Sequence, residues 1–74
     1  MPNTRRTERA RRNYIEAELK HQEAYEALLE ALEPMRQGVE TPGLIAAATL
    51  TANHKDRCAR RLKKARNRLK WLTK

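Results

Sequence analysis

The sequence has little of what most compact folds depend on. Its 74 residues include two glycines, one cysteine, three aromatic residues and no phenylalanine. A single cysteine, Cys58, excludes an internal disulfide framework and is typical of a protein of the reducing cytosol. Two glycines are too few for a glycine-rich phosphate-binding loop or for a β fold built on tight turns.

Long apolar runs are also missing. The longest, over residues 44–48, is much shorter than the roughly 18–20 residues that a membrane span needs. No apolar signal-peptide stretch follows the basic residues that end at Arg12. The sequence therefore predicts a small cytoplasmic protein of one domain that neither binds a membrane nor is secreted.

Charge is plentiful and strongly segregated. The chain has 17 lysines and arginines against nine acids, a net charge of +8. Residues 1–13 carry +4, residues 14–33 carry −5, residues 34–54 are neutral and residues 55–74 carry +9. Apolar residues recur between these charges at helical spacing, so the pattern indicates folded helices rather than disordered charged tails.

Two helices are predicted, over about residues 4–33 and 42–72. Pro34 lacks a backbone donor and disfavours helix in the residue before it, so the first helix should end there. Thr41 followed by Pro42 is a start signal for the second helix, because threonine can cap and proline is tolerated at the first helical position. No strand-like alternation competes with this interpretation, so the fold class is all-α.

The turn over residues 34–41 is short, which favours an antiparallel two-helix hairpin as the single domain. With the turn near Gly38, residue i lies opposite approximately residue 76 − i. In the basic N-terminal arm, residues 1–13, Arg5 to Arg12 then lie beside Lys64 to Trp71 of the basic C-terminal helix half, residues 55–74. The Glu-rich stretch lies toward the neutral start of the second helix. We therefore expect one end of the hairpin to be strongly basic.

The faces that join the helices are predicted from apolar spacing, with the alanines of the first helix assigned to helix propensity alone. The expected face of the first helix is Ile15, Leu19, Gln22, Tyr25, Leu28, Leu32 and Met35. The second helix carries two seven-residue ladders, Leu44, Thr51, Cys58, Ala65 and Leu72, and Ala48, Lys55, Leu62 and Leu69.

A hairpin with one contact seam buries too little apolar surface to be reliably stable as a monomer. We expect a second copy to cover the remaining apolar surface near the turn and to close a four-helix bundle; docking on a larger protein is the alternative. The residues expected at this interface are Tyr25, Leu28, Leu29, Leu32, Ile45 and Leu50.

The basic residues predict a polyanionic partner. Residues 55–74 hold ten bases and one acid, more than the helix dipole accounts for, and phosphate backbones are the commonest such partner. A solvated face and an acidic protein partner are the alternatives. The candidate RNA or DNA contacts are Arg5, Arg6, Arg9, Arg11, Arg12, Arg57, Arg60, Arg61, Lys63, Lys64, Arg66, Arg68, Lys70 and Trp71. Trp71 suits base stacking, although packing against the start of the first helix is favoured.

The most specific string reads T-R-R-T-E-R-A-R-R over residues 4–12. It resembles the arginine-rich RNA-binding motif of lambdoid phage N antitermination proteins, which read T-R-R-x-E-R with further basic residues behind, and the similarity covers residues 4–16. The resemblance implies a small phage-derived regulator of transcription that binds a transcript hairpin. It also implies RNA contacts from Arg5, Arg6, Arg9 and Arg11.

The sequence gives little support for a metal site or for catalysis. His21, His54 and Cys58 could converge as metal ligands, but no zinc-binding signature is present and Cys58 also fits the apolar ladder. No carboxylate pair or nucleophile–base arrangement can be placed on two helices. We therefore expect no enzyme activity, no metal or other cofactor and no small-molecule substrate.

The six glutamates of residues 14–33 have two interpretations. The favoured one pairs them with Lys55, Arg57 or Arg60 across the hairpin; the other makes them a docking surface for a basic partner. That second interpretation suits a different function, a protein–protein interaction module that modulates a larger assembly such as host RNA polymerase, a ribosome or a virion. A small DNA-binding protein is the third possibility.

Overall fold

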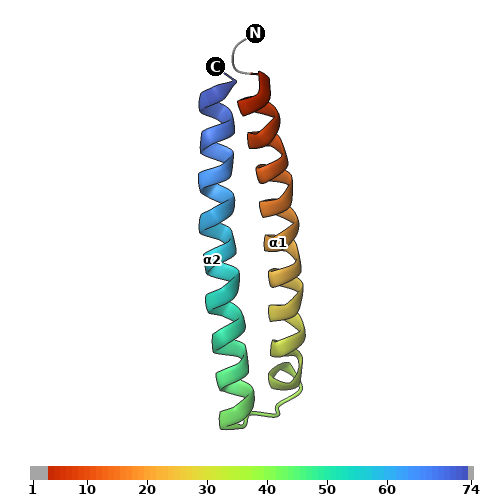
Figure 1. The fold of residues 1–74 in the computed structure, drawn as a ribbon. Helices are drawn as coiled ribbons and strands as arrows, with labels where there is room; N and C mark the ends of the chain where they lie inside the picture. The colour runs from red at the N-terminus through yellow and green to blue at the C-terminus, as the bar shows by residue number, and fades with distance from the viewer. Residues whose placement is uncertain (1–3, 74) are drawn as a thin grey trace.

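The computed structural model describes residues 4–73 as two α-helices packed side by side (Figure 1). Helix α1 spans Thr4–Arg36 and helix α2 spans Pro42–Leu72. The helices run antiparallel in a rod of 57 × 15 × 13 Å, with the start of α1 and the end of α2 at the same end of the rod. No residue in the described range belongs to a strand, and the predicted all-α hairpin is confirmed.

Helix α1 continues through Pro34 and ends at Arg36, so the predicted end just before the proline is wrong. Pro34 lies in the last turn, where its missing N–H removes a single helical hydrogen bond. Gly38 then ends the helix in the left-handed conformation, at a φ of 88°. Its N–H donates to the carbonyl of Met35 at 3.0 Å, and the N–H of Val39 donates to that of Pro34 at 2.9 Å. This is the Schellman arrangement, which satisfies the free carbonyls of a helix end.

Helix α2 starts as predicted. The Thr41 hydroxyl accepts a hydrogen bond from the N–H of Leu44 at 3.2 Å, and Pro42 occupies the first turn. The connection between the helices, residues 37–41, is shorter than the predicted turn because α1 extends beyond its proline.

The two glycines should respond oppositely to substitution by alanine. At Gly38 a Cβ meets no atom within 4 Å, but the positive φ is unfavourable for an L-residue, so Gly38→Ala should destabilise the hairpin by about 1 kcal/mol. Gly43 lies in the first turn of α2, with equally open space, and Gly43→Ala should stabilise by about 0.5 kcal/mol through helix propensity. Urea unfolding followed by far-UV circular dichroism measures both. Shifts of the same sign would contradict the assigned turn.

Small side chains form the seam between the helices. The buried residues are Ala10, Ala17, Ala24, Ala48 and Cys58. Three of these come from an α1 ladder of alanines that recurs every seven residues, and the fourth alanine of the ladder, Ala31, is half-buried. All nine residues of the two predicted α2 ladders are buried or half-buried, so the predicted contact face of α2 is confirmed.

The predicted contact face of α1 is wrong for most of its residues. Leu28, Leu32 and Met35 are half-buried, but Ile15 and Leu19 are 64% and 55% exposed. The seam is formed instead by the alanine ladder and by a second ladder four residues away: Thr7, Tyr14, His21, Leu28 and Met35. Gln22 and Tyr25, which also belong to the predicted face, are exposed.

Charge explains this choice of face. At seven-residue intervals, the face of α1 that holds Leu19 also carries Arg5, Arg12, Glu26 and Glu33. Turning that face toward α2 would remove four charges from water, which is costly without a partner for each. The alanine face carries no charge and allows the helix backbones to approach closely.

The rod has a large surface for its mass. Its accessible area is 6194 Å², whereas a compact monomer of 8.7 kDa is expected to expose about 4,700 Å². Ample surface is therefore free for a partner.

Candidate functional site

The hairpin gathers the basic segments toward the end of the rod where α1 begins and α2 ends (Figure 1). One guanidinium nitrogen of Arg61 lies 3.5 Å from Oε1 of Glu16, which places the register within one residue of the expected one. Residues 4–13 consequently lie beside about residues 63–72, whereas residues 57–62 lie beside about residues 14–19, which include Glu16 and Glu18. We call residues 4–13 and 57–72 together the basic pole; they carry thirteen bases and one acid.

All fourteen residues predicted to contact nucleic acid lie in the basic pole and are exposed. Nine of them line three shallow hollows on α1, between the helices and on α2. The hollows share residues: Asn13 lines the first two, and Arg61 and Lys64 line the second and third. The hollows therefore form one continuous basic belt, whose bases are Arg5, Arg6, Arg9, Arg12, Arg57, Arg60, Arg61, Lys64 and Arg68.

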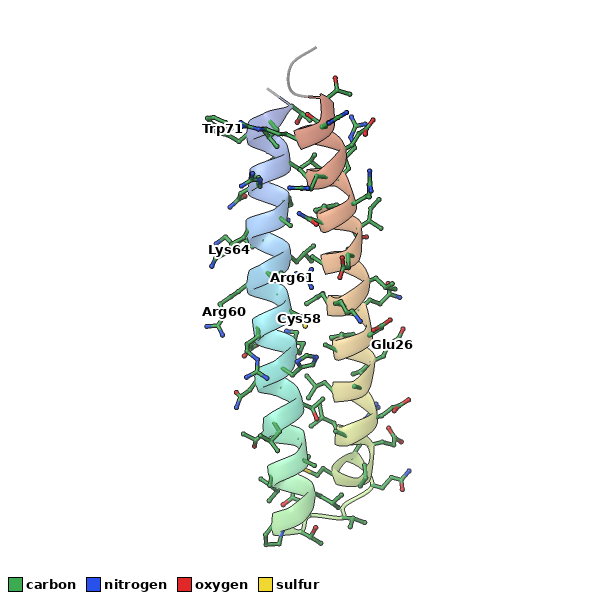
Figure 2. The ribbon with its side chains drawn as sticks, viewed as in Figure 1. Glu26, Cys58, Arg60, Arg61, Lys64 and Trp71 are labelled. Atoms are coloured by element: carbon green, nitrogen blue, oxygen red, sulfur yellow. The ribbon has the colours of Figure 1, made fainter. Side chains whose placement is uncertain are left out.

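The remaining bases of the pole do not line these hollows. By their positions in the heptads, they lie on the other flank of the hairpin: Arg11, Lys63, Arg66 and Lys70. Within the belt, Arg60 and Lys64 extend from α2 on the side away from α1, whereas Arg61 lies toward α1 (Figure 2). The belt thus curves from the outer face of one helix over the groove to the outer face of the other.

Trp71 is 73% exposed and extends from α2 away from α1 (Figure 2). The favoured prediction, packing against the start of the first helix, is wrong. The seam at this level is occupied by Leu69 and Leu72, both half-buried. The indole ring is left on the surface beside the bases of the pole.

The belt has little internal neutralisation. Its acidic neighbours are Glu8 and Glu16, and within residues 4–73 the Glu16–Arg61 contact is the single ion pair between the helices. Both side chains of that pair are half exposed, so its contribution is at most about 1 kcal/mol and is screened by salt. The remaining bases repel one another unless an external anion neutralises them.

The predicted pairing of the α1 glutamates with Lys55, Arg57 or Arg60 is wrong. Lys55 lies 3.9 Å from its neighbour Asp56 instead. Apart from Glu16, the glutamates with an ion-pair partner use bases of α1 itself: Lys20–Glu23 at 3.9 Å and Arg36–Glu33 at 3.8 Å. The acidic stretch therefore faces water rather than α2.

The histidine–cysteine set is only partly brought together. Nε2 of His54 lies 3.8 Å from Sγ of Cys58, one helical turn away. Within residues 4–73, no group of three or more potential metal ligands converges. Neither described helix has the length and apolarity to cross a membrane.

The six residues predicted for a dimer interface do not share one surface. Leu28 and Leu32 are half-buried, whereas Tyr25, Leu29, Ile45 and Leu50 are exposed. By heptad position, Leu50 lies on the flank of the basic belt, and the other three exposed residues lie on the opposite flank.

Comparison with known proteins adds no relative: no family model, curated protein or solved structure matches this chain.

Proposed function

We propose that this protein binds nucleic acid through its basic belt, chiefly by contacts with phosphates. The observation that carries the proposal is the antiparallel register, which brings the thirteen bases of the basic pole toward one end of the rod, where the neighbouring stretch of α1 holds three acids, Glu8, Glu16 and Glu18. Nine of those bases line connected hollows. Arginine is well suited to this role, because its planar fork can hold a phosphate with two hydrogen bonds.

The shape of the rod favours binding across the phosphate backbone over insertion into a groove. The major groove of B-DNA is about 12 Å wide and admits one helix, whereas the paired helices measure 15 × 13 Å in cross-section. The inner face of α1, with Ala10 and Ala17, is covered by α2. Phosphate contacts position a protein but carry little sequence information, so we expect weak sequence preference.

The length of the pole sets the expected number of contacts. Residues 57–72 of α2 extend about 24 Å at 1.5 Å per residue, which matches about seven phosphates of one strand. If about five are neutralised, the logarithm of the association constant should fall with that of the salt concentration with a slope of about −4.5.

Fluorescence anisotropy tests the proposal with a labelled DNA duplex, an RNA hairpin and a single strand of similar length. Binding to at least one probe is expected to weaken about 500-fold between about 50 and 200 mM salt. No binding to any probe at the lower concentration would overturn the proposal. Binding independent of salt would also overturn it, because phosphate contacts must release counterions.

The resemblance of residues 4–16 supports a narrower proposal, a regulator that acts on transcription by binding a transcript hairpin. Of the four arginines that the resemblance implicates, Arg5, Arg6 and Arg9 line the belt, whereas Arg11 lies on the other flank. A preference of more than about tenfold for an RNA hairpin over duplex DNA of equal charge would support this version. Equal affinity for the RNA hairpin and the duplex DNA would support phosphate binding without recognition of a transcript hairpin.

A protein–protein interaction module is the second candidate function, because many large apolar side chains are exposed. They are Ile15, Leu19, Tyr25, Leu29, Val39, Ile45, Leu50 and Trp71. Replacing the four arginines implicated by the resemblance with alanine separates the two functions. Nucleic-acid binding predicts lost activity with an intact fold, whereas docking through apolar residues predicts little change.

A further inference from the structure

The face of α1 turned away from α2 carries a distinctive order of residues. Glu26 marks this face, since it extends from α1 on the side away from α2 (Figure 2). Ile15 and Leu19 lie in the middle of the face, exposed beside a shallow hollow that they line with Glu18 and Gln22. The residues at seven-residue intervals, which we call the outer stripe, are Arg5, Arg12, Leu19, Glu26 and Glu33.

The charge order of α1 is unfavourable for the helix by itself. Residues 4–13 carry +4 and residues 14–33 carry −5, whereas the helix dipole favours acids at the N-terminus and bases at the C-terminus. The first turn of α1 contains no acid. Helix α2 offers little compensation, because the Glu16–Arg61 contact is the single ion pair between the helices in the described part of the chain.

We propose that the outer stripe binds the outer stripe of a second copy of this chain, forming an antiparallel, two-fold symmetric dimer. The stripe is self-complementary: it is basic at one end, apolar in the middle and acidic at the other. Such a pattern suits an isologous interface, in which the same patch of both copies meets itself reversed. Parallel pairing would place arginine against arginine and glutamate against glutamate.

The centre of the dimer lies between Ile15 and Leu19. Reversal about that point brings Ile15 of each copy beside Leu19 of the other, so that the four exposed apolar side chains cover one another. The same reversal places the α1 arginines within about one helical turn of the α1 glutamates of the second copy. The facing sets are Arg5, Arg9 and Arg12 against Glu23, Glu26 and Glu30.

This centre also gives the two rods a long overlap. Helix α1 spans Thr4–Arg36, so its midpoint, residue 20, lies about three residues from this centre. The two copies of α1 therefore lie along one another over about residues 4–30 of each, with each α2 on the outside. The resulting order is a layer, α2–α1–α1–α2, because the outer stripe lies opposite the seam. This arrangement replaces the compact four-helix bundle expected from the sequence.

The dimer does not depend on nucleic-acid binding. It uses three α1 arginines of the basic belt and leaves the five belt residues of α2 exposed. With few large apolar side chains at its centre, it should be a weak dimer whose charged contacts weaken as salt rises.

Charge reversal tests the dimer without nucleic acid. One variant carries Arg5→Glu, Arg9→Glu and Arg12→Glu, and the other carries Glu23→Lys, Glu26→Lys and Glu30→Lys. In sedimentation equilibrium at about 100 μM protein and about 50 mM salt, the wild-type chain should dimerise and each variant should be monomeric. An equimolar mixture of the variants should restore a dimer, because each outer stripe then meets its opposite charge.

A second pair of variants tests the apolar centre. Leu19→Ser should weaken the dimer at least about tenfold, because Leu19 becomes buried only when the second copy binds. Leu50→Ser removes an equally large exposed side chain from α2 and should leave the dimer unchanged. Circular dichroism confirms that each variant keeps its helices. A monomeric wild-type chain, variants that dimerise as well as the wild type, or equal effects of the two serine substitutions would overturn the proposal.

Discussion

Ala17→Leu is expected to destabilise the hairpin by about 2 kcal/mol, the largest effect that we predict for a single substitution. Ala17 is 1% exposed, at the centre of the alanine ladder that packs on α2. Adding three carbon atoms there forces the helices apart or the side chain into a strained rotamer, which typically costs about 1–3 kcal/mol. For a chain of this size, the melting temperature should fall by roughly 8–16 °C.

Ala27→Leu is the matched control, because Ala27 is exposed on the same helix. Its expected effect lies within about 0.5 kcal/mol of zero. Thermal and urea unfolding followed by circular dichroism compare the two variants at equal protein concentration. An unchanged or raised melting temperature for Ala17→Leu would contradict the close packing of the alanine ladder against α2, because the seam would then accept a larger side chain.

Loss of three bases of α2 that line the hollow between the helices should weaken nucleic-acid binding about 100-fold. The variant carries Arg61→Ala, Lys64→Ala and Arg68→Ala. Each lost phosphate contact should contribute about 1 kcal/mol and should reduce the salt slope by about one. Fluorescence anisotropy across a salt series measures both quantities.

The control variant changes the same helix and the same net charge on the opposite flank: Lys63→Ala, Arg66→Ala and Lys70→Ala. It should lose less than about fivefold, since only long-range attraction is reduced. Equal losses in the two variants would show that overall charge, rather than the belt, determines affinity. The fold should survive in both, because the substituted side chains are exposed.

The helix boundaries show where local sequence signals are sufficient. Thr41 and Pro42 act within one turn, and the start of α2 is as predicted. Pro34 does not end α1, because a proline in the last turn removes only one hydrogen bond. The end of α1 is set instead by Gly38, whose positive φ supports the closing hydrogen bonds of the helix.

The contact face of α1 could not be chosen by counting large apolar residues. Leu19 satisfies the helical spacing, but its face also holds charges, and only the comparison of all faces shows that the alanine face is the uncharged one. The signal was present in the sequence as Ala10, Ala17, Ala24 and Ala31, seven residues apart. Because alanine is a strong helix former, the repeat was assigned to propensity instead of packing.

The composition of the basic pole followed from the sequence, whereas its internal geometry did not. Register alone places the basic segments side by side. The division into two flanks depends on which face of each helix meets the other, and the contact face of α1 was wrongly predicted. The same dependence accounts for Trp71, whose direction is set by the heptad position of its neighbours Leu69 and Leu72.

The start of α1 and the end of α2 lie at the same end of the rod, which determines where a probe can be attached. An affinity tag or fluorophore at either terminus would sit against the basic pole and compete with a phosphate ligand. The turn at residues 37–41 lies at the far end of a 57 Å rod. Immobilisation through a cysteine introduced at Glu40, which is exposed, would attach the molecule by its turn and leave the basic pole free in solution.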